Sequence, residues 1–427
     1  MQEHSLRQTD KKINERNRIQ MLSKIISTLI ASVLLTGSAI AMADATVNVP
    51  ESTILPPPAP SEHIPEPPAP NVRAYLLMDY ASGRVLFGKA YEDQIDPASL
   101  TKMMTSYVIG QEIRLGRLHL DDKVTISENA WSKNYSDSSK MFIEVGKEVP
   151  VELLNKGIII ASGNDACIAM AEHIAGSESS FASLMNEWAK RIGLKGTHFV
   201  NSHGLYDENH YSTAYDMALL GRALIRDLPE EYAIYSEKEF SFNGIKQMNR
   251  NKLLWDTTIN ADGIKTGHLS QVGYNLVASA VHPTNGMRLI SVIIGDVSEK
   301  ERAAHSKELL RYGMRFYEPY TAFKQGQVLA TKEVRLGDKD TLSIGTASDV
   351  SLVVPVNSVN RMKAEYSLDQ KNLVAPIQKG TKIGVLNLSL DGKVIYKTNL
   401  VALNEIKEGG FASRTWDHVV IFFKDLF

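Results

Sequence analysis

The sequence has 427 residues, with 47 Lys and Arg against 49 Asp and Glu, which gives a formal net charge of −2. Charges of both signs are mixed along the chain. The net charge therefore does not indicate a highly charged partner, and we expect no nucleic-acid ligand. The length is enough for two domains of about 100 to 200 residues each. The eleven histidines have no spacing of the zinc type, so we expect no metal and no other cofactor.

Residues 1–43 are typical of a secretory signal peptide. A lysine precedes an apolar run over residues 25–35, and small residues follow up to Ala43, after which we predict cleavage. The run is too short to span a bilayer comfortably, and no stop-transfer segment follows it. The charged stretch 1–20 is long for the start of a signal, which makes Met21 an alternative first residue.

The single cysteine, Cys167, cannot form a disulfide within the chain, although exported proteins commonly use them. A lone thiol could be reactive. Cys167 instead follows the sequence SGNDA in an apolar helical pattern, which favours a small buried side chain.

Residues 44–71 form a proline-rich tether. Nine of the sixteen prolines lie between residues 50 and 70, and almost no regular hydrophobic period runs through them. Such a segment is extended and semi-rigid.

Residues 72–320 are predicted to form one domain with an antiparallel sheet flanked by helices, an α/β (α+β) fold. The sequence over 73–88 predicts two strands joined by an Ala-Ser-Gly turn, and 274–295 repeats the hairpin pattern with Asn-Gly at the turn. The patterns between the hairpins are helical, so one sheet built from both ends of the segment is the economical solution. We expect a closing helix over 306–320, ended by Pro319.

Two further segments follow. Residues 321–405 contain short apolar runs separated by Gly, Asp and Asn turns, which predicts a small all-β domain.

Residues 406–427 predict an amphipathic helix. Its apolar face consists of Trp416, Val419, Val420, Phe423 and Phe427. That face could dock on the protein itself or lie in a membrane interface. Its aromatic content and terminal position favour the membrane, although the polar face is not basic.

The stretch DPASLTKMMTSYVIG, residues 96–110, places Ser99 and Lys102 one turn apart at the start of a predicted helix. Asp96 suits the N-cap and Pro97 the first helical position, so we expect the helix to begin there. The spacing predicts that its buried face contains Leu100, Met103, Met104, Tyr107 and Val108.

A serine hydroxyl becomes a good nucleophile only when an adjacent base removes its proton. Lys102 could be that base for Ser99 if burial or nearby positive charge lowers its pKa. A helix N-terminus is electropositive, and the Met-rich buried face would limit access of water. The Ser-x-x-Lys pattern alone is weak evidence, because it occurs by chance in a chain of this composition.

Two later motifs carry side chains that suit the same chemistry. In SGNDA, Ser162 and Asn164 offer a hydroxyl and a carboxamide that could relay a proton and orient a substrate amide. In IKTGH, Lys265 and Thr266 offer a cation and a hydroxyl to a carboxylate, and Gly267 would let a substrate backbone approach closely. Each motif alone is also compatible with an ordinary turn.

Together, the order Ser-x-x-Lys, Ser-Gly-Asn, Lys-Thr-Gly matches the signature of penicillin-binding proteins and serine β-lactamases. The surrounding DPASLTKMMTSYVIG, SGNDACIAMAEHIAG, NRNKLLWD and DGIKTGH closely resemble low-molecular-mass penicillin-binding proteins, the serine D-alanyl-D-alanine carboxypeptidases of the penicillin-binding protein 5 type. The resemblance runs from Val72 to the C-terminus. It implies a transpeptidase/β-lactamase-like catalytic domain, a small all-β domain, and a periplasmic enzyme that lies on the outer face of the inner membrane through its terminal helix.

The resemblance also implies roles for the motif residues. Ser99 would attack the carbonyl of the penultimate D-alanine of a peptidoglycan stem peptide and expel the terminal D-alanine, with Lys102 as base. Ser162 would relay a proton to the leaving amine, and Asn164 would hold the substrate amide and Lys102. β-Lactam antibiotics would acylate the same serine. The other implied substrate-binding residues are Lys265, Thr266, Gly267, His268 and Arg302. The backbone N–H groups of His268 and Ser99 would form the oxyanion hole.

Leu269 stands where family members often carry Thr, so a hydroxyl contact is missing and fine substrate discrimination is in question. His203 resembles a family position near the site, where we expect a structural role. For Arg302, a position on a helix surface is the competing interpretation of a carboxylate contact.

Three alternative functions stay open at this point. A β-lactamase would share the acylation step, but residues 202–214 lack the Glu-x-x-x-Asn arrangement of the class A enzymes. A D,D-endopeptidase would commonly lack the β-rich domain and the terminal helix. A non-catalytic peptidoglycan-binding protein has little support, because all motif side chains are present.

Overall fold

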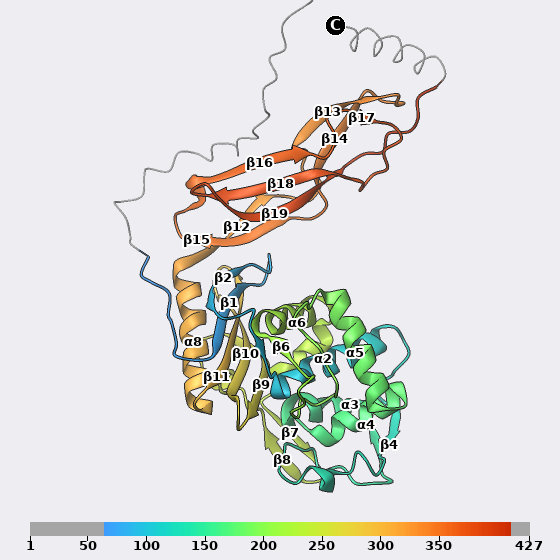
Figure 1. Cartoon of the computed structure of the whole chain (residues 1–427), viewed down its shortest axis with the longest axis vertical. Helices are drawn as coiled ribbons and strands as arrows, with labels where there is room; N and C mark the ends of the chain where they lie inside the picture. Colours follow the sequence, from blue (N-terminus) through green and yellow to red (C-terminus); the bar gives the residue numbers. More distant parts are fainter. Residues whose placement is uncertain (1–63, 411–427) are drawn as a thin grey trace, which may run out of the picture. The chain divides into compact units, whose positions relative to one another are not determined.

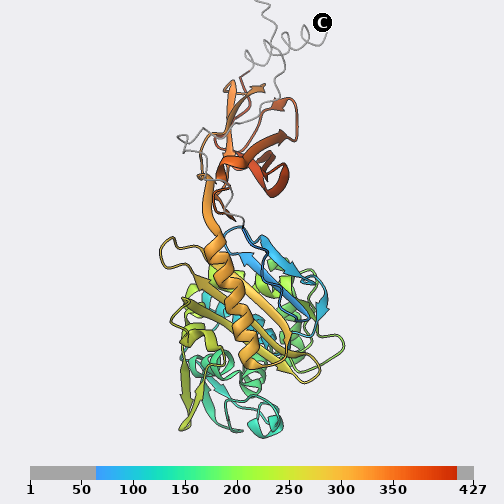
Figure 2. The same cartoon turned by 90° about the vertical axis from the view of Figure 1, so that its left-hand side faces the viewer.

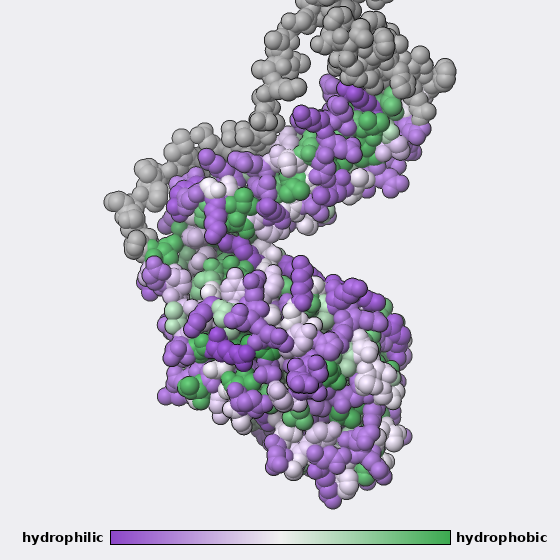
Figure 3. Space-filling model, viewed as in Figure 1, coloured by the Kyte–Doolittle hydropathy of each residue, from purple (hydrophilic) through white to green (hydrophobic). Residues whose placement is uncertain are grey.

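The computed structural model describes residues 64–410 of the chain. The predicted signal peptide, most of the tether and the apolar face of the terminal helix lie outside the described residues. Within residues 64–410, no helix is both long enough and apolar enough to cross a membrane. Figure 3 shows a largely hydrophilic face, on which hydrophobic residues lie in small separate groups.

A five-stranded antiparallel sheet is the centre of the first domain (Figure 1). Its strands lie in the order β2-β1-β11-β10-β9. Their bounds are β1 (Ala74–Asp79), β2 (Val85–Lys89), β9 (Ala261–Leu269), β10 (Gly273–Val281) and β11 (Arg288–Asp296). Both predicted hairpins are confirmed, and the pairing of β1 with β11 joins segments from opposite ends of the domain's sequence.

Helices lie between the two hairpins, as predicted. Their bounds are α2 (Lys102–Arg114), α3 (Val151–Lys156), α4 (Asn164–Ala175), α5 (Glu178–Ile192), α6 (Ala214–Asp227) and α7 (Pro229–Ala233), and α8 (Glu299–Phe316) follows the second hairpin. Short strand pairs join β3 (Gln94–Ile95) to β6 (Ser212–Thr213), β4 (Lys123–Thr125) to β5 (Glu148–Pro150), and β7 (Glu239–Phe242) to β8 (Ile245–Met248).

The sheet is buried on both faces because successive residues of β1 enter different cores. Leu76 and Met78 belong to a large core shared with the helices α2 to α6. Tyr75 and Leu77 belong to a second core, which contains Leu309 of α8. This is the two-residue alternation of a strand. Figure 2 shows α8 running across one face of the sheet.

Helix α2 lies at the centre of the large core. The predicted core residues Leu100, Met103, Met104, Tyr107 and Val108 are all buried. Every residue from Lys102 to Glu112 is also buried. The helix is therefore enclosed along these residues, and the buried polar side chains of Lys102, Thr105 and Ser106 have hydrogen-bond partners inside the protein. Cys167, on α4, is buried as predicted.

Two predicted helix limits are wrong. The first helix does not begin at Asp96 and Pro97: a turn of 3₁₀ helix over Ala98–Thr101 comes first, and α2 begins at Lys102. The closing helix begins earlier than residue 306, because Ser298 caps it by accepting a hydrogen bond from the N–H of Glu301.

Pro319 does not end the closing helix either. Helix α8 ends at Phe316, and Pro319 lies within the strand β12 (Tyr317–Phe323). A proline is tolerated in that strand because β12 pairs with only one neighbour among the described strands, β15 (Val350–Pro355).

The remaining strands form the predicted all-β domain. A six-stranded sheet has the order β16-β18-β19-β14-β13-β17. Its strands are β13 (Ala330–Arg335), β14 (Thr341–Thr346), β16 (Met362–Leu368), β17 (Leu373–Val374), β18 (Lys382–Leu390) and β19 (Lys393–Ala402). This domain has its own hydrophobic core, which contains Leu342, Ile344, Leu386 and Leu400.

Candidate active site

The three sequence motifs meet at one cleft. Ser99 lies in the 3₁₀ turn before α2, Ser162 and Asn164 lie at the start of α4, and Thr266 lies on the edge strand β9. Seven of the nine predicted site residues line the cleft: Ser99, Ser162, Asn164, Thr266, Gly267, His268 and Arg302. The other two, Lys102 and Lys265, are buried beneath it.

Lys102 is fully buried and contacts Ser99 directly. Its Nζ lies 3.0 Å from Ser99 Oγ, 2.7 Å from Asn164 Oδ1 and 2.6 Å from the backbone oxygen of His203. Burial lowers the pKa of Lys102 to about 8, and the positive charge of Arg250 acts in the same direction. A useful fraction of this amine is therefore uncharged near neutral pH.

The second motif contacts both lysines. Ser162 has a left-handed backbone, with φ of 61°, and its Oγ accepts a hydrogen bond of 3.0 Å from Lys265 Nζ. Asn164 accepts from Lys102 and donates to Ser138 Oγ over 2.9 Å. Burial lowers the pKa of Lys265 well below its usual value, and the charge of Lys102 adds to this effect.

Gly267 lies close to another part of the chain, and the approach of a substrate backbone stays a prediction. A Cβ atom at this position would lie 3.0 Å from the carbonyl oxygen of Pro97 and 3.3 Å from the backbone nitrogen of Ser99. The backbone that approaches Gly267 is therefore the turn of the chain that carries Ser99. The absence of a side chain lets β9 pack tightly against that turn.

Arg302 is not a surface residue of α8. It is buried, and its guanidinium donates to the carbonyl oxygens of Gly267 over 3.0 Å and Asn275 over 3.4 Å. Its NH2 nitrogen also lies 3.7 Å from Glu299 Oε1. Arg302 therefore ties α8 to the edge strand of the cleft, and the helix-surface interpretation is wrong.

Sequence reasoning missed Arg250, although it lies in the quoted stretch NRNKLLWD. Arg250 lines the same cleft and donates to Ser139 Oγ over 2.5 Å. Its positive charge acts on both buried lysines. Nothing in the local sequence indicates this position, because Arg250 and Ser139 are brought together only by the fold.

Sequence reasoning also missed Asp165, which follows Asn164 directly. Its carboxylate accepts from the backbone N–H groups of Met141, Phe142 and Ile143 over 2.8, 2.9 and 3.3 Å. Asp165 therefore fixes the segment that leads from the cleft serines Ser138 and Ser139 back into the core.

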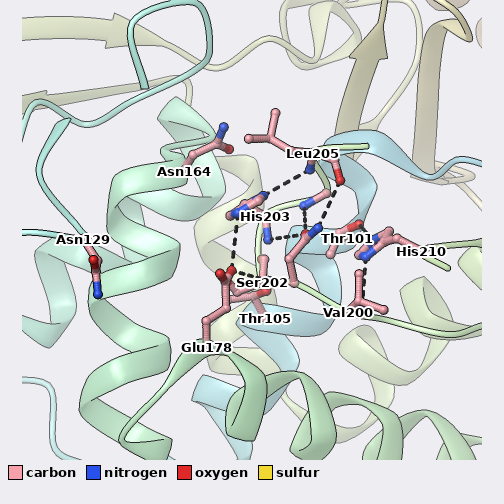
Figure 4. A network of polar contacts seen from close by, with 12 residues as sticks. Thr101, Thr105, Asn129, Asn164, Glu178, Val200, Ser202, His203, Leu205 and His210 are labelled. Carbon is pink, nitrogen blue, oxygen red and sulfur yellow. Dashed lines mark hydrogen bonds and ion pairs between the residues drawn. The ribbon is translucent and has the colours of Figure 1, made fainter. Parts of the chain in front are cut away.

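His203 lies on a loop beside Lys102, and Figure 4 shows the polar contacts around it. Its ring lines the cleft. Burial lowers the pKa of His203 to about 3, and the charge of Lys102 adds to this effect. The imidazole is therefore neutral near neutral pH. Leu269, the departure from the family pattern, also lines the cleft.

Within residues 64–410, no group of three or more His, Cys, Asp or Glu side chains is arranged to hold a metal ion.

Comparisons with known proteins agree with the geometry of the cleft. Residues 61–298 match the family model described as D-alanyl-D-alanine carboxypeptidase, and residues 317–408 match the model of the penicillin-binding protein 5 C-terminal domain. The chain is 48% identical over 361 residues to D-alanyl-D-alanine carboxypeptidase DacA of Haemophilus influenzae, covering 84% of this chain and 92% of that protein. It is 49% identical to DacA of Escherichia coli over 368 residues, covering 85% of this chain and 91% of that protein.

A solved structure also resembles this chain along most of its length. The crystal structure of penicillin-binding protein 5 from Haemophilus influenzae is similar to this chain with a TM-score of 0.77 and 49% identity, covering 80% of this chain and 99% of that one.

Proposed function

This chain belongs to the D-alanyl-D-alanine carboxypeptidase family, of the penicillin-binding protein 5 type, and on that premise we propose that its acyl-enzyme forms on Ser99. The family acts on peptidoglycan peptides and binds β-lactams. The observation that carries the assignment is the 3.0 Å contact between Ser99 Oγ and the fully buried Lys102 Nζ.

In the proposed acylation step, uncharged Lys102 takes the proton of Ser99 Oγ as that oxygen bonds to the carbonyl carbon of the penultimate D-alanine. The backbone N–H groups of Ser99 and His268 receive the developing oxyanion, and each such donor contributes about 3 to 4 kcal/mol. The C–N bond then breaks, and the terminal D-alanine leaves. Water finally hydrolyses the ester and regenerates the Ser99 hydroxyl.

Protonation of the leaving amine is assigned to Ser162, which would relay to that amine the proton that Lys102 took from Ser99. Its Oγ lies 3.0 Å from Lys265 Nζ, so the hydroxyl has a buried amine as its hydrogen-bond partner. The carboxamide of Asn164, which contacts Lys102, is placed to orient the substrate amide as well.

Recognition of the terminal carboxylate is assigned to the β9 side of the cleft. Thr266 supplies a hydroxyl and Lys265 positive potential, because a bound carboxylate would favour the charged form of Lys265 against the effect of burial. Arg302 acts from behind the strand, because its guanidinium already donates to Gly267 and Asn275. Leu269 replaces a hydroxyl with an apolar group at the cleft wall, so we expect altered preference among peptides rather than loss of hydrolysis.

The remaining assignments concern the whole chain. We place the catalytic domain at residues 72–320 and the β-rich domain at 321–405. Export by residues 1–43 and interfacial binding by the helix predicted within 406–427 would put the enzyme in the periplasm, on the outer face of the inner membrane.

The test is treatment with a labelled penicillin, followed by mass spectrometry of the peptide that contains Ser99. We expect one adduct per chain, on Ser99, and release of D-alanine from a peptide ending in D-Ala-D-Ala. The Ser99→Ala variant should show neither. D-Alanine release by Ser99→Ala at the parental rate would overturn the proposal, and rapid turnover of penicillin would indicate a β-lactamase.

A further inference from the structure

The loop over residues 200–210 places a backbone carbonyl on the lysine beneath the cleft. We propose that Glu178, at the start of α5, is a positioning residue that fixes this loop so that the His203 carbonyl aligns Lys102 toward Ser99. The inference rests on the proposed role of Lys102 as the base.

The alignment follows from counting hydrogen-bond donors. A charged lysine has three N–H donors, and Lys102 has three acceptors within 3.0 Å: Ser99 Oγ, Asn164 Oδ1 and the His203 oxygen. The uncharged amine has only two N–H groups and one lone pair. If the two carbonyl oxygens keep the N–H groups, the lone pair must point at Ser99 Oγ. The His203 carbonyl therefore sets the direction of the base.

Glu178 holds the two residues around that carbonyl. Its Oε1 accepts from the backbone N–H of Ser202 over 3.0 Å and from Ser202 Oγ over 2.8 Å. The same oxygen lies 3.3 Å from His203 Nε2. His203 Nδ1 accepts from the N–H of Leu205 over 3.1 Å, so Nε2 carries the proton and points it at Glu178. One carboxylate oxygen thus receives three donors from adjacent residues (Figure 4).

The other side of the loop is attached to the segment that carries Lys102 itself. Thr105, on α2, donates its hydroxyl to the carbonyl oxygen of Ser202. Thr101, immediately before Lys102, lies 2.7 Å from His210 Nε2 through its Oγ1. The loop is therefore held from α5 by Glu178 and from the Lys102 segment by two threonines. Loss of the Glu178 contact removes the attachment of Ser202 and His203 to α5, although α5 still binds Phe199, just before the loop, through Asn186.

The contacts predict that a charge at position 178 is not required. All three donors meet the same oxygen, Oε1, so a single acceptor atom at position 178 holds the loop. The amide of Gln keeps an equivalent acceptor oxygen. The variant Glu178→Gln should therefore preserve the alignment, whereas Glu178→Ala removes the acceptor and leaves the Ser202 and His203 donors without it.

The experiment measures the acylation rate constant with a fluorescent penicillin from pH 6 to 10, using the full chain. Because small displacements of reacting groups have large effects on rate, we expect Glu178→Ala to lower the high-pH plateau about tenfold. Glu178→Gln should stay within about threefold of the parent, on the same reasoning. Glu187→Ala, at an exposed position of the same helix, serves as the matched control and should be unchanged.

A lower plateau at high pH distinguishes misalignment from a changed lysine pKa, which would move the midpoint and leave the plateau intact. The number of labelled sites per folded chain must stay at one, which separates slow acylation from loss of folded protein. If Glu178→Ala does not fold, Thr105→Val tests the other attachment of the loop and should lower the plateau in the same direction.

Parental acylation by folded Glu178→Ala would overturn the inference, and so would an equally large loss in Glu178→Gln. Failure of the proposed function looks different, because labelling would then persist in Ser99→Ala, whatever residue occupies position 178.

Discussion

At the scale of single residues, the notable feature of Lys102 is that all three of its hydrogen-bond partners are uncharged. They are a hydroxyl, a carboxamide and a backbone carbonyl. Neutral acceptors stabilise an ammonium less than a carboxylate would, so burial dominates and the pKa of Lys102 falls to about 8. The site thus keeps a lysine that can lose its proton near neutral pH.

The pH dependence of acylation should follow the loss of a proton from Lys102. Only uncharged Lys102 can accept from Ser99, so the second-order acylation rate constant should rise with pH through a midpoint near 8. Stopped-flow measurements with a penicillin give the profile. Lys102→Arg should abolish acylation at every pH, because a guanidinium does not lose its proton. A flat profile between pH 7 and 9 would exclude Lys102 as the base.

Glu231 is a buried carboxyl outside the cleft. It accepts from Ser106 Oγ over 2.7 Å and from Asn155 Nδ2 over 2.8 Å. Burial raises the pKa of Glu231 to about 7, opposed by these two hydrogen bonds. In the unfolded chain the group titrates near its usual 4.5. Between these values the folded protein binds more protons than the unfolded chain, so this group's stabilising contribution falls as pH rises from about 4.5 through 7.

Glu231→Gln should remove that dependence. We expect the free energy of unfolding of the parent, measured in urea at intervals from pH 5 to 8, to decline more steeply than that of the variant. Glu230→Gln, at the exposed neighbouring position, is the control and should follow the parent. Parallel curves for the parent and Glu231→Gln would show that Glu231 titrates normally in the folded protein.

At the scale of elements, patterns within one segment were predicted well. The two hairpins, the buried face of α2 and the three motifs depend on residues close in sequence, and the structure has all of them. The start of α2 was predicted wrongly, because Asp-Pro fits a helix cap while the tertiary structure imposes a 3₁₀ turn over Ala98–Thr101. That turn packs against Gly267 of β9, a contact that local propensity cannot indicate.

The missed site residues share one physical reason. Arg250, Asp165 and Glu178 act on segments that are distant in sequence, and each is unremarkable in its own stretch. Arg250 contacts Ser139, and Glu178 contacts Ser202. Only the packing of the elements brings these pairs together.

Asp165 offers a prediction at this scale, because it ties α4 to the segment 141–143. Asn at this position keeps one acceptor oxygen but turns an NH₂ group toward backbone N–H donors. Two backbone donors then lose their acceptor, at a cost of about 1 to 3 kcal/mol for each donor. We expect Asp165→Asn to lower the urea midpoint and to speed hydrogen exchange of residues 141–143. Glu144→Gln, exposed and next to the segment, should change neither.

At the scale of the whole molecule, the two domains have separate cores, one around Leu76 and Met103 and the other around Leu342 and Leu386. Catalysis and any attachment to a surface can therefore reside in different parts of the chain. The sequence alone predicted two domains, because helical patterns give way near residue 321 to short apolar runs separated by turns.

Removal of the segment after Gly410 tests that separation. We expect the chain truncated at Gly410 to be acylated by penicillin at the parental rate, because every described residue of the cleft lies before that point. It should no longer sediment with phospholipid vesicles, because the predicted apolar face lies in the removed segment. Equal sedimentation of the two forms would contradict an anchoring role for that segment.

The pairing of β1 with β11 has a consequence for biosynthesis. A ribosome delivers β1 and Ser99 early, but β1 cannot take its place between β2 and β11 until Asp296 has been made. Lys265 arrives almost as late, on β9. Contacts between segments so far apart in the chain form slowly. The emerging polypeptide therefore carries its nucleophile without the folded surroundings that would activate it until the chain up to Asp296 has been made.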